Sequence, residues 1–179
     1  RFRRSGSAHA QADAPAEAHA HDVILFGLGR YGLAIAAELR DHGYRVLGVD
    51  FSPEAVRFAR RAGFDVVFGD AADPEMLSHL PIQAAKWLVM AVPEHDTGLT
   101  HDDPRTALVK AARDLGYGGR VALAAHSEHS AGVLDRVGAD LVLLPYRDAA
   151  LAAAHMIVGG AQGRGLAAPE PTGQKEFPS

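Results

Sequence analysis

The 179-residue sequence contains no cysteine. Disulfide bonds, thiolate metal sites and cysteine nucleophiles are therefore excluded, and the absence fits a cytosolic setting. The sequence also lacks an apolar run near the ~18 residues that a membrane-spanning helix needs, and its beginning lacks the apolar core of a signal peptide. Basic residues number 18 against 22 acidic ones, for a net charge of -4. This balance predicts no nucleic-acid partner, which a basic face would indicate.

Two catalytic motifs are absent as well. No Gly-x-Ser-x-Gly nucleophile elbow occurs, and the first glycine motif lacks the Lys-Ser or Lys-Thr pair of a P-loop. The side chains that could carry acid–base or metal chemistry form two groups, Glu94, His95 and Asp96, and His126, Glu128 and His129. These groups lie on separate predicted loops without a fixed ligand spacing, so the sequence predicts no metal site.

Strand and helix patterns alternate over residues 22–158, which we predict to be one domain. Residues 1–21, rich in Ala, His, Ser and Asp, are predicted to be a disordered linker. Residues 159–179 are mostly Gly, Pro and polar residues and are predicted to be a disordered tail. The expected strands cover 23–27, 45–50, 65–68, 86–92, 120–125 and 140–144, and the expected helices cover 31–42, 53–62, 74–80, 104–115, 127–137 and 146–158.

This alternation predicts an α/β fold, a Rossmann-like doubly wound parallel six-stranded sheet. The expected strand order is 3-2-1-4-5-6, with a ligand crevice above strands one and four, where the order reverses.

A dinucleotide-binding motif follows the first predicted strand. Its three glycines are Gly27, Gly29 and Gly32. The first lets the chain turn sharply, the second lets a pyrophosphate approach the backbone, and the third lets the helix pack on the sheet. The helix that follows offers its N-terminal N–H groups to the phosphate. The second strand ends in Asp50, about 20 residues further on, as this fingerprint requires.

Asp50 discriminates between ligands. Its carboxylate accepts hydrogen bonds from ribose hydroxyls and repels a 2′-phosphate, so NAD(H) or an adenine nucleotide such as AMP is favoured over NADP. Asp70 and the backbone beside it end the third strand on the same edge, where they either meet the adenine or only form a turn. Asp73 is predicted to be only a helix N-cap. Ser52 and Asp103 are likewise predicted to cap the helices that follow them.

Two other functions use the same glycine motif. A small NAD-dependent oxidoreductase would use His126 or His95 as its acid–base group. The residues after the sixth strand hold no substrate domain, however, which argues against an enzyme. A free-standing NAD-dependent scaffold subunit is the third possibility.

Four segments occur together in a characteristic order: FGLGRYG at 26–32, VD at 49–50, GDAAD at 69–73 and VGADLVLLP at 137–145. They resemble the RCK domain, also called KTN or TrkA-N, the cytosolic nucleotide-sensing module of potassium channels and transporters. The resemblance covers residues 22–158. The alanine-rich stretch before it and the lack of a following TrkA-C domain look most like the C-terminal domain of Kef-type cation/proton antiporters.

The resemblance implies a non-catalytic regulatory domain on the cytoplasmic side of the cell membrane. Such domains bind NAD(H), AMP, ADP or ATP and form homodimers, commonly through the sheet edge and the last helix. Ligand binding rearranges the dimer and so controls a membrane transporter part of the same or an associated polypeptide, which here implies potassium or cation/proton transport.

The resemblance also implies a set of nucleotide-binding residues. Phosphate contacts would come from Gly27, Leu28, Gly29, Arg30, Tyr31 and Gly32. The ribose and adenine side would be formed by Asp50, Phe51, Gly69, Asp70 and Ala71, and the crevice would be bordered by Val92 and Pro93. Family members often carry an arginine near the end of strand five. This chain has His126 there, which could substitute as a phosphate or ribose partner.

Overall fold

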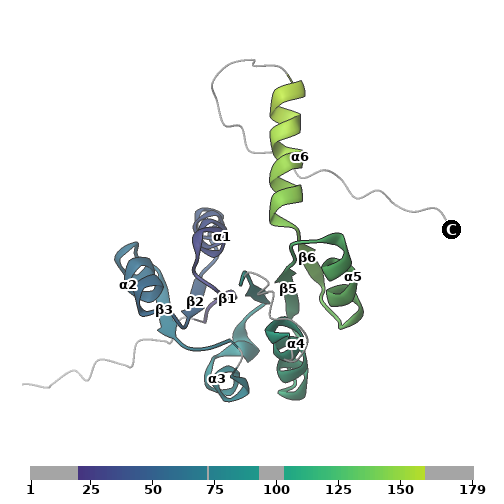
Figure 1. Cartoon of the computed structure of the whole chain (residues 1–179). Helices are drawn as coiled ribbons and strands as arrows, with labels where there is room; N and C mark the ends of the chain where they lie inside the picture. Colours follow the sequence, from purple (N-terminus) through teal and green to yellow (C-terminus); the bar gives the residue numbers. More distant parts are fainter. Residues whose placement is uncertain (1–19, 72, 93–102, 160–179) are drawn as a thin grey trace, which may run out of the picture. The chain divides into compact units, whose positions relative to one another are not determined.

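The computed structural model describes residues 20–71, 73–92 and 103–159 (Figure 1). Strands and helices alternate along the chain. They are β1 (Val23–Phe26), α1 (Arg30–Asp41), β2 (Val46–Asp50), α2 (Pro53–Arg61), β3 (Asp65–Phe68), α3 (Pro74–His79), β4 (Trp87–Met90), α4 (Pro104–Asp114), β5 (Arg120–Ala124), α5 (Glu128–Arg136), β6 (Leu141–Leu143) and α6 (Pro145–Val158). A short 3-10 helix at Ile82–Ala84, which the sequence did not predict, precedes β4.

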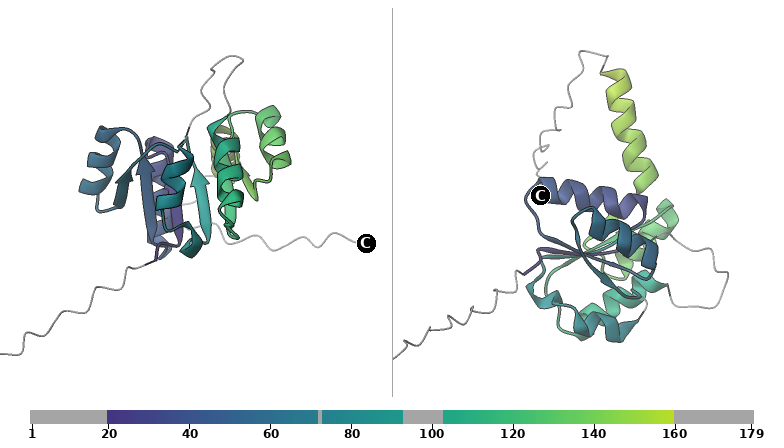
Figure 2. Two further views of the ribbon diagram at one scale, coloured as in Figure 1. Left: turned by 90° about the horizontal axis from the view of Figure 1, so that it is seen from below. Right: turned by 90° about the vertical axis from the view of Figure 1, so that its left-hand side faces the viewer.

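The sheet confirms the predicted architecture. Its six strands are all parallel and follow the order β3-β2-β1-β4-β5-β6. The predicted ends of the elements differ from the observed ones by a few residues, most at β4. Helices α1 and α2 lie on one face of the sheet, and α3 and α4 lie on the other (Figure 2). The winding direction therefore changes between β1 and β4.

Strand β1 is apolar along its whole length, as expected for a strand that helices cover on both faces. All four residues of β1 are buried. Ile24 and Phe26 point into the core cluster that includes residues of α3, α4 and α5, whereas Val23 and Leu25 point into the cluster beneath α1 and α2. The edge strands β3 and β6 are more exposed. Both core clusters contain side chains of β1 and β4. They therefore stabilise the pairing that brings the carboxyl ends of these two strands together.

Side-chain caps begin four of the helices, as the sequence predicted for the first three of them. Ser52 accepts a hydrogen bond from the Ala55 N–H at 3.3 Å. Asp73 accepts from the Glu75 N–H at 2.9 Å, and Asp103 from the Arg105 N–H at 2.9 Å. Ser127 caps α5 in the same way. These caps set where each helix starts above the sheet.

An apolar groove of about 620 Å³ runs along α1, between its outer flank and strands β4, β5 and β6. We call it the α1 groove. It is lined by Val23, Tyr31, Ala34, Ile35, Glu38, Leu39, His42, Tyr44, Trp87, Val89, Ala122, Leu141 and Leu143. Its wall on the sheet side is entirely apolar, and the size and chemistry of the groove suit another apolar segment rather than water.

The chain divides into a compact unit that ends at Pro145 and a second unit that begins at Tyr146. The second unit contains most of α6, a helix without buried residues. Its exposed apolar side chains include Leu151, Met156, Ile157 and Val158. All but the last two residues of the predicted linker (1–21) and all but the first residue of the predicted tail (159–179) lie outside the described residues. Within the described ranges, no helix has the length and hydrophobicity to cross a lipid bilayer.

Candidate functional site

The carboxyl ends of the parallel strands bring the predicted site residues to one edge of the sheet. The β1–α1 loop lies there beside the end of β2, because β1 and β2 pair in register from Val23 with Val46 to Phe26 with Val49. The end of β3 lies next to β2, since Phe68 pairs with Asp50. On the other side of β1, Met90 at the end of β4 pairs with Phe26. The switch point between β1 and β4 is where ligands bind in such sheets.

The three motif glycines meet different surroundings. Gly27 has φ +90°, and a Cβ there would lie 2.9 Å from Val92 Cγ2. A Cβ on Gly32 would overlap the carbonyl oxygen of Gly27, so the first turn of α1 is pressed against the loop. A Cβ on Gly29 would meet nothing within 4 Å. Gly27 and Gly32 thus serve the fold, while Gly29 leaves open space above the loop.

The N-terminus of α1 differs from those of α2 to α5. Its N-cap is Gly29, which provides no side-chain hydrogen bond, and its first turn carries no acidic residue. Helices α2, α3 and α5 have a side-chain cap and a Glu in the first turn, and α4 is capped by Asp103. The positive end of the α1 dipole, above Gly29, therefore has neither a side-chain cap nor an acidic residue of its own first turn beside it, which favours an anion there.

Asp50 connects the loops on either side of it. Its Oδ2 accepts a hydrogen bond from the Leu28 N–H at 2.6 Å, and its Oδ1 accepts one from the Ser52 N–H at 2.7 Å. The side chain of Leu28 is buried and packs against Gly48. A carboxylate oxygen has two lone pairs, so each oxygen of Asp50 can still accept a further donor. Asp50 thus orients the glycine loop and keeps acceptor capacity for a ligand.

The outer side of the edge, past β2 and β3, carries two exposed phenylalanines. Phe51 and Phe68 are each 60% exposed. Phe51 was among the predicted site residues, whereas Phe68 was missed, although it ends the strand that pairs with Asp50. An aromatic residue at the end of an edge strand was the available signal. Exposed aromatic side chains offer flat apolar faces to a planar ring.

The loop after β3 lies at the same edge. Gly69 is buried, and a Cβ there would run into the Met76 side chain. Asp70 is exposed, and Ala71 packs against the core cluster. Asp73 serves as the N-cap of α3, as predicted.

The far side of the crevice is described in part. Val92 lies against Gly27, whereas Pro93 and the group Glu94, His95 and Asp96 fall outside the described residues. His126, Glu128 and His129 follow β5 and are exposed. Within the described ranges, no three His, Asp or Glu side chains are arranged to hold a metal ion.

Arg105 is a buried charge that the sequence pattern did not indicate. Its side chain is 4% exposed and pairs with Asp103, with Nη2 2.6 Å from Oδ2. Its Nη1 donates to the Ala124 carbonyl oxygen at the end of β5, 2.9 Å away. The resemblance had pointed to His126 as the positive group near this strand end. The structure shows that a guanidinium reaches the same strand end from α4.

Arg105 also sets the protonation of Asp103. Burial alone would raise the pKa of Asp103, but the hydrogen bonds and charge of Arg105 outweigh burial and hold that pKa below its ordinary value of 3.8. Because the folded pKa is lowered, the ionised carboxylate stabilises the fold above this value, and that stabilisation is lost as the pH falls through the folded pKa.

We expect Arg105→Met to lower the free energy of unfolding by about 3 kcal/mol at neutral pH, because it breaks a buried ion pair. The stability of the variant should also fall less than that of the wild type between pH 5 and pH 2, since Asp103 loses the partner that lowers its pKa. Urea unfolding over this range measures both effects. Arg57→Met, which removes an exposed pair with Glu54, is the control, with an expected loss below about 1 kcal/mol. An equal loss in both variants would contradict the assignment.

Comparison with protein families gives a match over most of the compact unit. The profile described as "TrkA-N domain" matches residues 23–145. The Ktr system potassium uptake protein C of Bacillus subtilis is 28% identical over 137 residues, which cover 76% of this chain and 59% of the relative. The glutathione-regulated potassium-efflux system protein KefC of Escherichia fergusonii is 27% identical over 101 residues, covering 53% of this chain and 16% of the relative. The chain thus spans less than two thirds of the length of these curated relatives.

Solved structures share the fold. The Kef C-terminal domain of Shewanella denitrificans in its AMP-bound form superposes with a TM-score of 0.61 and 23% identity, covering 78% of this chain and 82% of that one. The GsuK channel bound to NAD superposes with a TM-score of 0.58 and 18% identity, covering 73% of this chain and 22% of that one. At these identities the likeness establishes the Rossmann-like fold.

Proposed function

This chain belongs to the TrkA-N domain family, and we propose on that premise that it is a nucleotide-sensing regulatory domain that controls potassium transport. The observation that carries the proposal is the open, uncapped N-terminus of α1 at Gly29, beside the carboxylate of Asp50. An anion-binding helix end next to a ribose-binding carboxylate fits a nucleotide. The names of the relatives, which are potassium uptake and efflux proteins, supply the transport context.

The ligand we propose is NAD(H) or an adenine nucleotide such as AMP. Its phosphate lies above Gly29 at the start of α1, and its ribose hydroxyls donate to Asp50. A 2′-phosphate would meet the negative charge of Asp50, so NADP is disfavoured. The adenine extends toward Phe51 and Asp70. The AMP and NAD named for two structural neighbours are consistent with this choice.

We propose that the domain performs no catalysis. Family relatives by name are transport proteins, and His126, the described candidate for an acid–base group, is exposed on the loop after β5. The competing proposal is an NAD-dependent oxidoreductase. Turnover of NADH with simple carbonyl substrates, lost in His126→Ala, would favour that competing function.

The partners we propose are a second copy of this chain and a membrane transporter part, which places the domain on the cytoplasmic side of the membrane. Helix α6 exposes Leu151, Met156, Ile157 and Val158, and the α1 groove offers an apolar surface of matching chemistry. We propose that α6 of the second copy occupies this groove. Burial of both surfaces from water would drive the association, and ligand binding would favour one dimer arrangement.

Calorimetry with NAD, NADH, AMP and ATP tests the nucleotide part of the proposal, and sedimentation of the 179-residue chain tests the dimer. We expect at least one nucleotide to bind with a dissociation constant of about 100 μM or tighter, equivalent to about 5.5 kcal/mol. NADP should bind more weakly than NAD. A chain that binds none of these nucleotides would refute the proposed function.

A further inference from the structure

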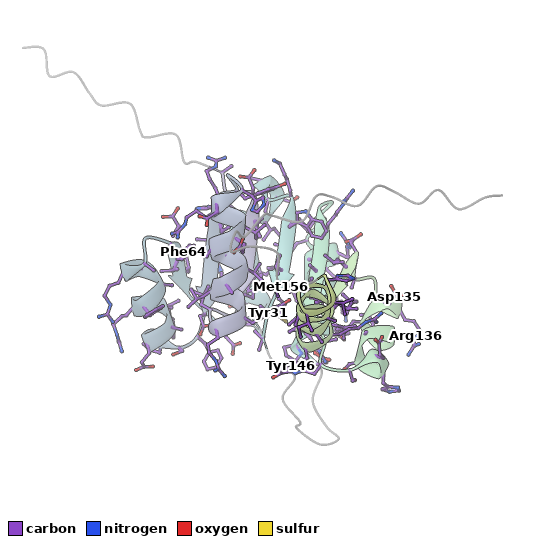
Figure 3. All side chains as sticks on the ribbon, turned by 90° about the horizontal axis from the view of Figure 1, so that it is seen from above. Tyr31, Phe64, Asp135, Arg136, Tyr146 and Met156 are labelled. Atoms are coloured by element: carbon purple, nitrogen blue, oxygen red, sulfur yellow. The ribbon has the colours of Figure 1, made fainter. Side chains whose placement is uncertain are left out.

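One side chain belongs to both the glycine motif and the α1 groove. Tyr31 stands between Gly29 and Gly32 in the motif, in the first turn of α1. Its side chain lines the α1 groove and packs partly buried against the core cluster beneath α1. It lies on the flank of α1 opposite Phe64, which lies toward α2 (Figure 3). Two surfaces to which we assign different ligands therefore share this residue.

We infer that Tyr31 couples nucleotide binding to occupation of the α1 groove by the second copy. The inference rests on the proposed function and names the residue through which that site is regulated. Tyr31 acts as a positioning residue: the ligand contacts the backbone around it, and the groove occupant contacts its ring.

The first turn of α1 and the glycine loop form one stiff unit. Gly32 is pressed against the carbonyl of Gly27, leaving no room for a Cβ between them. The Leu28 side chain fills the space beside Gly48 in the core. The Leu33 N–H donates to the Gly29 carbonyl at 2.9 Å, so the helix begins directly at the loop. Close packing of this kind transmits a displacement instead of absorbing it.

A nucleotide acts on the hydrogen bond that positions this unit. The Leu28 N–H is held by Asp50 at 2.6 Å. Ribose hydroxyls that donate to the remaining lone pairs of Asp50 share its negative charge with the Leu28 N–H and so weaken that hydrogen bond, and a phosphate attracts the N–H groups around Gly29. Nucleotide binding therefore changes the hydrogen bonds that position the glycine loop, and with them the position of the Tyr31 backbone in the first turn of α1.

The groove has aromatic side chains at both ends. Tyr31 lies at the end nearest the crevice, because α1 starts above the carboxyl edge of the sheet. Tyr44 and Trp87 line the opposite end, next to the starts of β2 and β4. A helix lying along the groove would contact both ends, but only the Tyr31 end is part of the nucleotide loop. This difference supplies a matched control.

The test measures the dimer dissociation constant by sedimentation, with and without saturating AMP or NADH, for the wild type, Tyr31→Ala and Tyr44→Ala. We expect the nucleotide to change the wild-type constant by about fivefold or more, in the range of allosteric coupling. Tyr44→Ala should weaken the dimer and keep this factor. Tyr31→Ala removes the ring but keeps the backbone N–H groups of the loop, and calorimetry sets the nucleotide concentration that saturates this variant. Its dimer constant, measured with and without that saturating nucleotide, should give a coupling factor close to one.

The possible results separate the inference from the proposed function. A wild-type chain that binds no nucleotide, or forms no dimer at any concentration, overturns the proposed function. A wild-type factor of one, or a Tyr31→Ala chain that keeps the wild-type factor, overturns only the inference. Circular dichroism checks folding, and Tyr31→Leu, which keeps an apolar side chain at the site, replaces Tyr31→Ala if that variant unfolds. The loss of coupling in Tyr31→Leu then supports the inference, and its retention refutes it.

Discussion

Replacing Asp50 by alanine is expected to weaken the binding of AMP and NAD at least about a hundredfold. The ligand would lose the hydrogen bonds that its two ribose hydroxyls donate to the carboxylate, and each such bond is worth about 1.5–3 kcal/mol when one partner is charged. The same change should reduce discrimination between NAD and NADP, because it removes the negative charge that faces a 2′-phosphate. Calorimetry with the three nucleotides measures both effects.

The matched control is Asp73→Ala. Asp73 is an aspartate at the same edge of the sheet, but it caps α3 through the Glu75 N–H. Its replacement should cost about 1 kcal/mol of stability and leave nucleotide affinity unchanged. Asp50→Asn separates charge from shape, since it keeps an acceptor for Leu28 or Ser52. Undiminished affinity in Asp50→Ala would remove Asp50 from the proposed site.

The same substitution, glycine to alanine, is expected to change the stability of the fold by very different amounts at two positions three residues apart. Gly32→Ala should destabilise the fold by about 3 kcal/mol, because the new methyl group overlaps the Gly27 carbonyl in a packed loop. Gly29→Ala should cost no more than about 1 kcal/mol, the usual difference at an N-cap, because its Cβ meets nothing within 4 Å. Its φ of -67° and ψ of -172° are also open to alanine.

Nucleotide binding should reverse this order. Gly29→Ala places a methyl group where the phosphate approaches, and we expect affinity to fall about tenfold or more. Urea unfolding measures the stability of the two variants, and calorimetry measures their nucleotide affinity. A Gly29→Ala variant that binds normally would show that the phosphate does not pass over this residue.

The architecture of this protein was predictable because its local signals agree with one another. Apolar runs buried on both faces identified the strands. The N-caps at Ser52, Asp73 and Asp103 located the starts of three helices, and each of these side chains accepts the expected backbone N–H. The change of winding direction after the third strand followed from the order of elements. The proximity of the glycine motif to Asp50 was also predictable, because neighbouring parallel strands end at the same edge of the sheet.

Contacts between distant segments were not predictable. Arg105 reads as an ordinary helix residue in the sequence, yet it bonds the Ala124 carbonyl 19 residues away. Phe68 was predicted only as the end of the third strand, and the exposure of its ring was not inferred from the sequence. The α1 groove depends on which side of α1 faces β4 to β6, and periodicity alone does not determine that. Tyr31 was predicted to contact phosphate only because it stands among the glycines of the phosphate-binding motif, and its place in the groove was not predicted.

The switch point between β1 and β4 has a consequence for how this protein folds. The proposed nucleotide site draws on the segment from Gly27 to Gly32, on Asp50 and on Asp70, and it is bordered by Val92, which lies against Gly27 just after β4. Val92 reaches this place only after β1 has paired with β4, a pairing of long sequence separation that therefore forms slowly. A fragment that ends before β4 contains the proposed ligand contacts but lacks this border of the site. A bound nucleotide should therefore slow the global unfolding of the compact unit, and its concentration should set how long the domain survives in the cell.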